Sequence, residues 1–227
     1  MTEKKNAAIK AAEYIEDNMT VGLGTGSTVY YVIERVGELV KHGLNIKAVA
    51  TSLSTANIAS GSNIPVVSID AVERIDLAID GVDEIDGGFN AIKGGGGALF
   101  REKMVATLAE RVIWIMDSSK VVDAIGTFPL PVEILTYGYN HILRKLELLS
   151  LSPVLRLKSD GPFLTDNHNY IVDLHIGKGF DIKYVSEQLK AIPGVLETGL
   201  FLNMCDRIIV GIKDEVKVIE NPGRLRQ

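Results

Sequence analysis

Hydrophobic residues recur along most of this chain in two patterns, one typical of helices and one typical of short buried strands. Residues 3–17 have apolar positions at helical spacing, residues 21–23 form a short apolar run, and residues 28–42 return to helical spacing before Gly43. Strands alternating with helices in this way predict a parallel sheet covered on both faces. The further candidates are strands at 46–51, 65–68, 75–80 and 111–116, and helices at 54–59 and 98–110.

The pattern changes after residue 128, where Phe128-Pro129-Leu130-Pro131 interrupts it. Residues 139–149 and 181–191 are helical, and residues 169–175 alternate like a half-buried strand. A proline-rich joint followed by such elements predicts a smaller α+β domain. The last two strands, 207–212 and 216–219, fit either sheet. We therefore expect an α/β domain of residues 1–128 plus 204–227, and a smaller domain of residues 129–203.

The composition is that of an ordinary globular protein and excludes several classes of function. The 227 residues are 46% hydrophobic, and their net charge of -5 provides no basic field for nucleic acid. We see no apolar signal core and no apolar run long enough to span a bilayer, so we expect a cytoplasmic protein without a membrane partner. Cys205 is the single cysteine, which excludes an intrachain disulfide and favours a buried, reduced thiol.

A glycine-rich loop lies between the first predicted strand and the helix that follows it. In Gly22-Leu23-Gly24-Thr25-Gly26-Ser27-Thr28, amides and hydroxyls would surround the helix N-terminus, where a phosphate group binds well. The glycine spacing does not match the dinucleotide fingerprint, and the loop lacks the lysine of a nucleotide P-loop. A tight structural turn explains the same glycines equally well at this point.

Four polar clusters directly follow predicted strands. In a parallel sheet these clusters meet at the carboxyl edge, where open α/β folds bind ligands. For Lys120 by itself, a solvated surface lysine remains the default interpretation. The clusters are Gly24 to Thr28, Thr51-Ser52, Asp80 to Glu84, and Asp117-Ser118-Ser119-Lys120.

The densest set of candidate catalytic groups lies between Ile79 and Lys103. An acidic turn, Asp80-Gly81-Val82-Asp83-Glu84, precedes Lys93 and four glycines, and Glu102 follows near the start of a predicted helix. Carboxylates can act as a base or an acid, an ammonium can stabilise an oxyanion, and glycines let backbone amides approach a ligand. This set suits proton transfer on a small polar molecule.

Glu102 points in a different direction from its charged neighbours if the helix forms. Each step along a helix turns by about 100°, so Arg101 and Lys103 would not share its direction. A solvated glutamate in a first helical turn is the simpler explanation from position alone. The four histidines have no spacing typical of a metal site, so we predict no metal.

Together these motifs resemble ribose-5-phosphate isomerase, type A. The match comprises the glycine loop, the acidic turn, Lys93-Gly94-Gly95-Gly96-Gly97-Ala98-Leu99 with Arg101-Glu102-Lys103, and Ser118-Ser119-Lys120, in the family's order and spacing. Weaker matches extend over nearly the whole chain. The resemblance implies a reversible, cofactor-free isomerisation of D-ribose 5-phosphate to D-ribulose 5-phosphate in the non-oxidative pentose phosphate pathway.

The family's residue roles carry over to matching positions here. Glu102 is implied to be the base that moves a proton from C2 to C1 through a cis-enediolate, Lys93 to steady the oxyanion, and Asp80 to assist ring opening. The implied substrate contacts are Thr25, Gly26, Ser27, Thr28, Asp80, Gly81, Val82, Asp83, Lys93, Gly94, Gly95, Gly96, Lys120 and, less directly, Lys4.

The resemblance also implies fold and assembly. We expect a doubly wound, CoA transferase-like α/β domain with a smaller ferredoxin-like domain near the C-terminus, in a homodimer or homotetramer. Two alternatives share such a sheet: a non-catalytic sugar-phosphate-binding sensor domain, which would lack Glu102, and a CoA transferase, which usually needs a longer or paired chain. Fold alone does not separate these activities.

Overall fold

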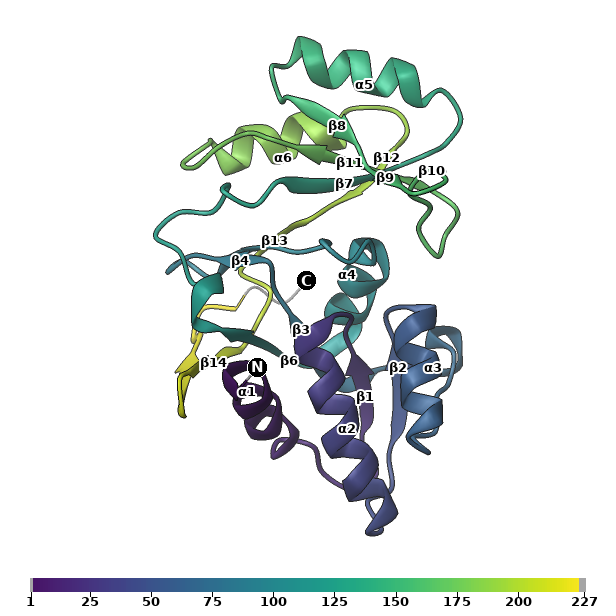
Figure 1. The fold of residues 1–227 in the computed structure, drawn as a ribbon, viewed down its shortest axis with the longest axis vertical. Helices are drawn as coiled ribbons and strands as arrows, with labels where there is room; N and C mark the ends of the chain where they lie inside the picture. Colours follow the sequence, from purple (N-terminus) through teal and green to yellow (C-terminus); the bar gives the residue numbers. More distant parts are fainter. Residues whose placement is uncertain (1, 225–227) are drawn as a thin grey trace. The chain divides into compact units, whose positions relative to one another are not determined.

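The computed structural model describes residues 2–224, which pack into two compact units (Figure 1). Unit 1 comprises residues 2–82, 101–121 and 203–224, and unit 2 comprises residues 83–100 and 122–202. The chain therefore passes four times from one unit to the other. One passage lies inside the acidic turn, and another lies immediately before Arg101-Glu102-Lys103.

Unit 1 is built on a six-stranded sheet in the order β15-β14-β6-β3-β1-β2. Its neighbouring strands are parallel except for the β14–β15 pair, which is antiparallel. The expectation of a mostly parallel α/β sheet is confirmed, and both C-terminal strands belong to it. The strands are β1 (Thr20–Leu23), β2 (Lys47–Ala50), β3 (Ile75–Gly81), β6 (Ala109–Asp117), β14 (Arg207–Ile212) and β15 (Glu215–Glu220).

Helices cover both faces of this sheet. Alternate strand residues such as Leu23 and Ile79 share a buried core with apolar residues of α1 (Thr2–Ala12) and α2 (Ser27–Lys41), which lie side by side. On the opposite face, Gly22 lies against Val105 of α4 (Leu99–Leu108). This is the period-2 alternation of a sheet buried on both sides. Helix α3 (Leu53–Gly61) packs beside β2 and α2.

Two elements of unit 1 are shorter than their sequence patterns predict. Helix α1 ends at Ala12 rather than near residue 17. The amides of the next three residues donate to carbonyls three positions earlier in the chain, which is the hydrogen bonding of a tighter 3₁₀-type turn and not of an α-helix. The expected strand 65–68 makes only an isolated parallel bridge, between Val66 and Ala48. The short 3₁₀ helix η1 (Ile69–Ala71) begins directly afterwards and leaves no room for a longer strand.

Unit 2 contains a four-stranded antiparallel sheet in the order β12-β7-β11-β8. Apolar residues of α5 (Tyr139–Leu148) and α6 (Ile182–Lys190) share a core with alternate residues of β7 and β11. In chain order the elements run β7-α5-β8-β11-α6-β12. The strands are β7 (Leu130–Ile134), β8 (Pro153–Leu155), β11 (Tyr170–Leu174) and β12 (Val195–Thr198).

A second sheet of unit 2, in the order β13-β5-β4, joins distant parts of the chain. Because β13 (Leu200–Leu202) pairs with β5 (Asn90–Ile92), and β5 with β4 (Glu84–Ile85), residues 83–100 pack with unit 2. The packing units therefore differ from the expected domain boundaries at residues 83–100, 122–128 and 203. Those boundaries stay a prediction about folding domains. A small hairpin, β9 (Leu157–Lys158) and β10 (Gly161–Pro162), completes the unit.

The segment around Pro131 was expected to interrupt the pattern, but it forms strand β7 between β11 and β12. The carbonyl of Pro131 accepts a hydrogen bond from the Gly199 amide, at 2.7 Å. A strand residue directs its carbonyl and its N–H to the same neighbour, so the N–H that proline lacks would point to that side. On that side β12 has already ended at Thr198. The absence of an N–H on Pro131 therefore removes no hydrogen bond from the β7–β12 pairing.

Cys205 is fully buried, as its hydrophobic character predicts. Burial, followed by the nearby charge of Asp206, raises the pKa of its thiol from 9.0 to about 12. The neutral thiol therefore adds stability below pH 9 that is lost as the pH rises toward about 12. We expect Cys205 to resist an aromatic disulfide reagent at pH 8 until the chain is unfolded. Rapid, stoichiometric labelling of the native protein would contradict this environment.

Candidate active site

The glycine loop leads from the end of β1 directly into α2. The Gly24 amide donates to the Ile79 carbonyl of β3 at 2.9 Å, so the loop begins by extending the sheet. Gly26, with a φ of 121°, then occupies the cap position of α2 without a side chain over the helix end. The first amides of α2 are consequently placed as the sequence predicts for anion binding.

Asp80 lies at the end of β3 and is buried against this loop. Its Oδ1 accepts hydrogen bonds from the amides of Gly81, at 2.7 Å, and Thr25, at 3.1 Å. A Cβ on Gly24 would overlap the Asp80 carboxylate. Glycine is therefore required at position 24 for close approach to the carboxylate rather than for a special backbone conformation.

A cluster of hydroxyl groups connects the ends of β1 and β2. The Thr25 Oγ1 lies 2.8 Å from Thr51 Oγ1 and 2.9 Å from Ser52 Oγ. Thr55 donates from its hydroxyl to the Gly24 carbonyl at 2.8 Å. The predicted convergence of the polar clusters after β1, β2 and β3 is thus confirmed within unit 1. The Thr25 hydroxyl points into the cluster of hydroxyl groups.

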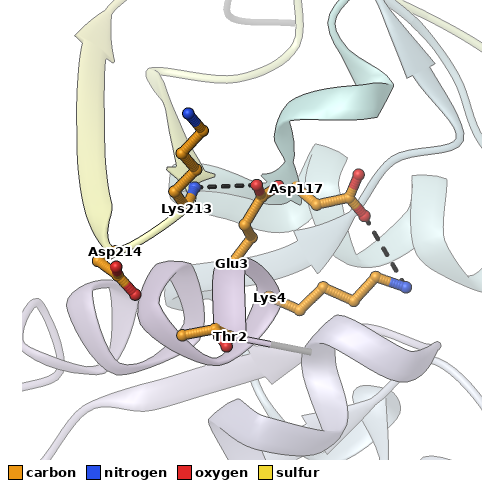
Figure 2. Close-up of a pocket in the computed structure, with 6 residues that line it drawn as sticks. All are labelled: Thr2, Glu3, Lys4, Asp117, Lys213 and Asp214. Carbon is orange, nitrogen blue, oxygen red and sulfur yellow. Dashed lines mark hydrogen bonds and ion pairs between the residues drawn. The ribbon is translucent and has the colours of Figure 1, made fainter.

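Lys4 brings the fourth strand end to the same loop. Its Nζ donates to Ser27 Oγ at 3.0 Å and lies 3.8 Å from Asp117 Oδ2, at the end of β6 (Figure 2). The short 3₁₀ helix η2 (Ser118–Lys120) follows, and the Asp117 carboxylate caps it by accepting from the Ser119 amide. Lys4 and half-buried Lys120 thus both belong to unit 1, with the glycine loop.

A cavity of about 360 Å³ opens beside Lys4 (Figure 2). Glu3 anchors its wall, because its carboxylate accepts from the Lys213 amide at 2.9 Å and from both the amide and the hydroxyl of Ser118. The Lys213 bond, then the Ser118 bonds, lower the pKa of Glu3. Sequence reasoning missed Glu3, since no local pattern relates position 3 to position 213. The lining residues are Thr2, Glu3, Lys4, Asp117, Lys213 and Asp214.

The second half of the acidic turn lies in unit 2 and has two separate functions. Asp83 accepts from the Gly95 amide through Oδ2 at 2.7 Å, and a Cβ on Gly95 would stand 2.7 Å from its other oxygen. Glu84 instead accepts from the amides of Gly126 and Phe128, at 2.8 and 2.9 Å. Asp83 therefore faces the glycine run, whereas Glu84 holds a structural loop.

Lys93 follows β5 and is only 2% exposed. Its amide donates to the Gly199 carbonyl at 2.9 Å, and its Nζ lies 5.3 Å from the centroid of the Phe201 ring. An ammonium over an aromatic face in a dry environment interacts strongly with nearby charge. After Lys93 the chain turns, with a hydrogen bond from the Gly97 amide to the Gly94 carbonyl.

Glu102 lies in the first turn of α4 and is 4% exposed, whereas Arg101 and Lys103 are both partly exposed. This difference in exposure agrees with the different directions that helical geometry predicts for the three side chains. The simpler interpretation, a solvated glutamate, is wrong. A carboxylate of this kind, buried near a helix N-terminus, has the chemistry of a general acid or base.

Among residues 2–224, no group of three or more His, Cys, Asp and Glu side chains is arranged to hold a metal ion. Within the same described residues, no helix combines the length and apolar character that crossing a membrane requires.

A family model described as ribose 5-phosphate isomerase A (phosphoriboisomerase A) matches residues 47–215. The chain belongs to this family. The resemblance read from the motifs is thereby confirmed, and ribose 5-phosphate isomerase A membership makes the chain an isomerase.

Relatives of the same family align over nearly full length. Ribose-5-phosphate isomerase A of Bifidobacterium adolescentis is 47% identical over 97% of this chain and 96% of that protein. A solved D-ribose-5-phosphate isomerase in complex with phospho-erythronic acid superimposes with a TM-score of 0.92 at 38% identity, covering 96% of this chain and 97% of the other. Ribose 5-phosphate isomerase from Plasmodium falciparum gives 0.91 at 39% identity, covering 96% and 98%.

The residues expected from the family pattern form two groups in the structure. Unit 1 brings together the glycine loop, Asp80 and Lys4, and it also contains Glu102 and Lys120. Unit 2 brings Asp83 to the glycine run and contains Lys93.

Proposed function

We propose that this chain catalyses the reversible conversion of D-ribose 5-phosphate to D-ribulose 5-phosphate, with Glu102 as the base. The observation that carries the assignment is the almost complete burial of Glu102 in the first turn of α4, directly after the glycine run. The names of its full-length relatives support the substrate. No cofactor is required, because the reaction only moves hydrogen within one molecule.

Glu102 removes the proton from C2 of the opened aldose and returns it to C1, while a second proton passes from O2 to O1. The intermediate is a cis-enediolate, and the developing negative charge on oxygen is stabilised by the Lys93 ammonium. Asp80 assists ring opening, and Asp83 holds sugar hydroxyls. The burial of Lys93 supports its role, since an ammonium acts more strongly where water is excluded.

The phosphate group is held by the amides at the start of α2, the hydroxyls of Ser27 and Thr28, and the ammonium groups of Lys4 and Lys120. The 3.0 Å bond from Lys4 to Ser27 supports this grouping. Thr25, Gly26, Gly81, Val82 and Gly94 to Gly96 complete the substrate contacts through their backbone.

We expect Lys120→Ala to weaken binding roughly 10- to 100-fold, the effect of losing one charge-assisted contact, with little change in kcat. The measurement is KM for ribose 5-phosphate together with the inhibition constant of inorganic phosphate. The control is Lys41→Ala, because Lys41 is an exposed lysine at the end of α2. The role is wrong if the affinity for phosphate is unchanged.

We also propose a class for each unit and an assembly for the protein. Unit 1 is CoA transferase-like, and the β7 to β12 part of unit 2 is ferredoxin-like; its chain order of β-α-β-β-α-β supports the latter. The protein is cytoplasmic. It assembles as a homodimer or homotetramer, and light scattering of the purified chain tests this oligomeric state directly.

The decisive experiment for the function is conversion of ribose 5-phosphate by the purified, chelator-treated protein, followed as ketose formation. Turnover without added metal supports the proposal. Binding of the sugar phosphate without turnover would replace it with the sensor interpretation, and acyl transfer without sugar isomerisation would favour a CoA transferase.

A further inference from the structure

Arg156 makes an unusual set of hydrogen bonds within unit 2. Its Nε and Nη2 donate to the two carboxylate oxygens of Asp173, at 2.9 and 2.5 Å. Both side chains are less than one-fifth exposed, at 16% and 19%. A planar, two-bond ion pair of this kind fixes the direction of the guanidinium far better than a surface ion pair does.

The remaining donor of Arg156 reaches the glycine run. Its Nη1 donates to two successive backbone carbonyls, Gly94 at 3.0 Å and Gly95 at 3.1 Å. A half-buried guanidinium that holds two carbonyls of a glycine-rich turn restrains a segment whose own residues have no side chains to restrain it. The Phe163 ring adds to this restraint, because it lies 5.8 Å from the guanidinium carbon and packs against Gly97.

These contacts fix the peptide group between Gly94 and Gly95 at both ends. Its carbonyl accepts from Arg156, and its N–H donates to Asp83 Oδ2 at 2.7 Å. The next peptide group joins Gly95 to Gly96, and its carbonyl also accepts from Arg156. In a trans peptide the N–H points opposite to the carbonyl, so the Gly96 N–H is directed away from Arg156.

We propose that Arg156 is a positioning residue that presents the Gly96 amide as an oxyanion donor, in addition to the ammonium of Lys93. This inference rests on the proposed isomerase function. A charged donor on the Gly95 carbonyl polarises the shared peptide group and makes the Gly96 N–H a stronger donor to the enediolate oxygen. Asp173 fixes the orientation of the guanidinium, and Asp83 holds the peptide group between Gly94 and Gly95.

The test compares Arg156→Lys and Arg156→Gln with the wild-type protein. Lysine keeps a positive charge but lacks the planar fork, so it cannot hold Asp173 and both carbonyls at once. We expect kcat to fall about 10- to 100-fold in Arg156→Lys, and further in Arg156→Gln, while KM changes less than about threefold, because the lost interaction belongs to the transition state. Arg144→Lys, on the exposed side of α5, is the matched control and should behave as wild type.

Two additional readouts separate positioning from simple structural support. Phospho-erythronic acid carries a planar carboxylate resembling the enediolate, so its inhibition constant should rise in proportion to the loss of kcat/KM. In the wild-type protein, its binding should move the Gly96 amide proton downfield in an NMR titration, and Arg156→Lys should reduce that shift. The titration needs no variant and stays informative if Arg156→Gln fails to fold.

The results distinguish this inference from the function on which it rests. An inactive wild-type protein would overturn both. An active wild type with folded Arg156 variants of unchanged kcat, or a Gly96 amide that does not respond to phospho-erythronic acid, would overturn only the role of Arg156.

Discussion

Glu102→Gln should bind ribose 5-phosphate with nearly wild-type affinity but lose roughly 10²- to 10⁴-fold in kcat, the usual contribution of a positioned general base. Glutamine has almost the same shape and keeps a hydrogen-bonding group in the first turn of α4, so the buried position remains filled. Only the ability to take and return the proton is removed. Steady-state kinetics with ribose 5-phosphate, together with calorimetric binding of phospho-erythronic acid, measures both quantities.

The control is Glu110→Gln. Glu110 is exposed and forms a surface ion pair with Arg74, at 3.1 Å, whose loss should cost little stability and no activity. Near-normal turnover in Glu102→Gln would mean that another group is the base. If the wild type binds the sugar phosphate without converting it, the sensor interpretation replaces the enzyme.

The second large effect is expected for Lys93→Met, which keeps an unbranched side chain of nearly the same length and removes its charge. Loss of one oxyanion-stabilising group in a water-excluded site lowers kcat by about 10²- to 10³-fold. Lys93 is 2% exposed, and its ammonium lies 5.3 Å from the centroid of the Phe201 ring, against which a methionine also packs favourably. We therefore expect the variant to fold, and comparing its thermal unfolding midpoint with that of the wild type distinguishes a catalytic loss from a folding defect.

Lys183→Met, an exposed position on α6, controls for the general effect of replacing a lysine in unit 2. The result that contradicts the role of Lys93 is a folded variant whose kcat stays within a fewfold of wild type. A rise in KM alone would show that Lys93 binds substrate and transition state equally.

Local sequence patterns predicted those parts of the structure that depend on local periodicity. The strand and helix repeats located most elements of unit 1, and the rule for parallel sheets brought Thr25, Thr51 and Asp80 to one edge, where their atoms are in hydrogen-bonding contact. Helical geometry predicted that Glu102 and Arg101 point in different directions, but it did not predict which of the two is buried. Each of these inferences needs only the residues of one helix or strand and its flanking loop, combined with a general rule of helix or sheet geometry.

The remaining features depend on contacts between distant segments. Strand β5 pairs with β13 more than a hundred residues later, and neither is long enough to give a pattern of its own. The Arg156–Asp173 pair is similar: the alternating segment 169–175 contained Asp173, but nothing local indicated which side chain would face it. Pro131 was misinterpreted because the place where β12 ends cannot be seen from its own neighbours.

The position of β14 has a consequence for synthesis on the ribosome. This strand pairs with β6 and packs against α1, yet it lies near the end of the chain. Helix α1 emerges long before β14, and its buried alanines belong to the core that β14 completes. That core stays incompletely covered until residues 207–212 have been translated, so unit 1 acquires its complete sheet only after β14 has left the ribosome, however early its first β-α-β segment forms.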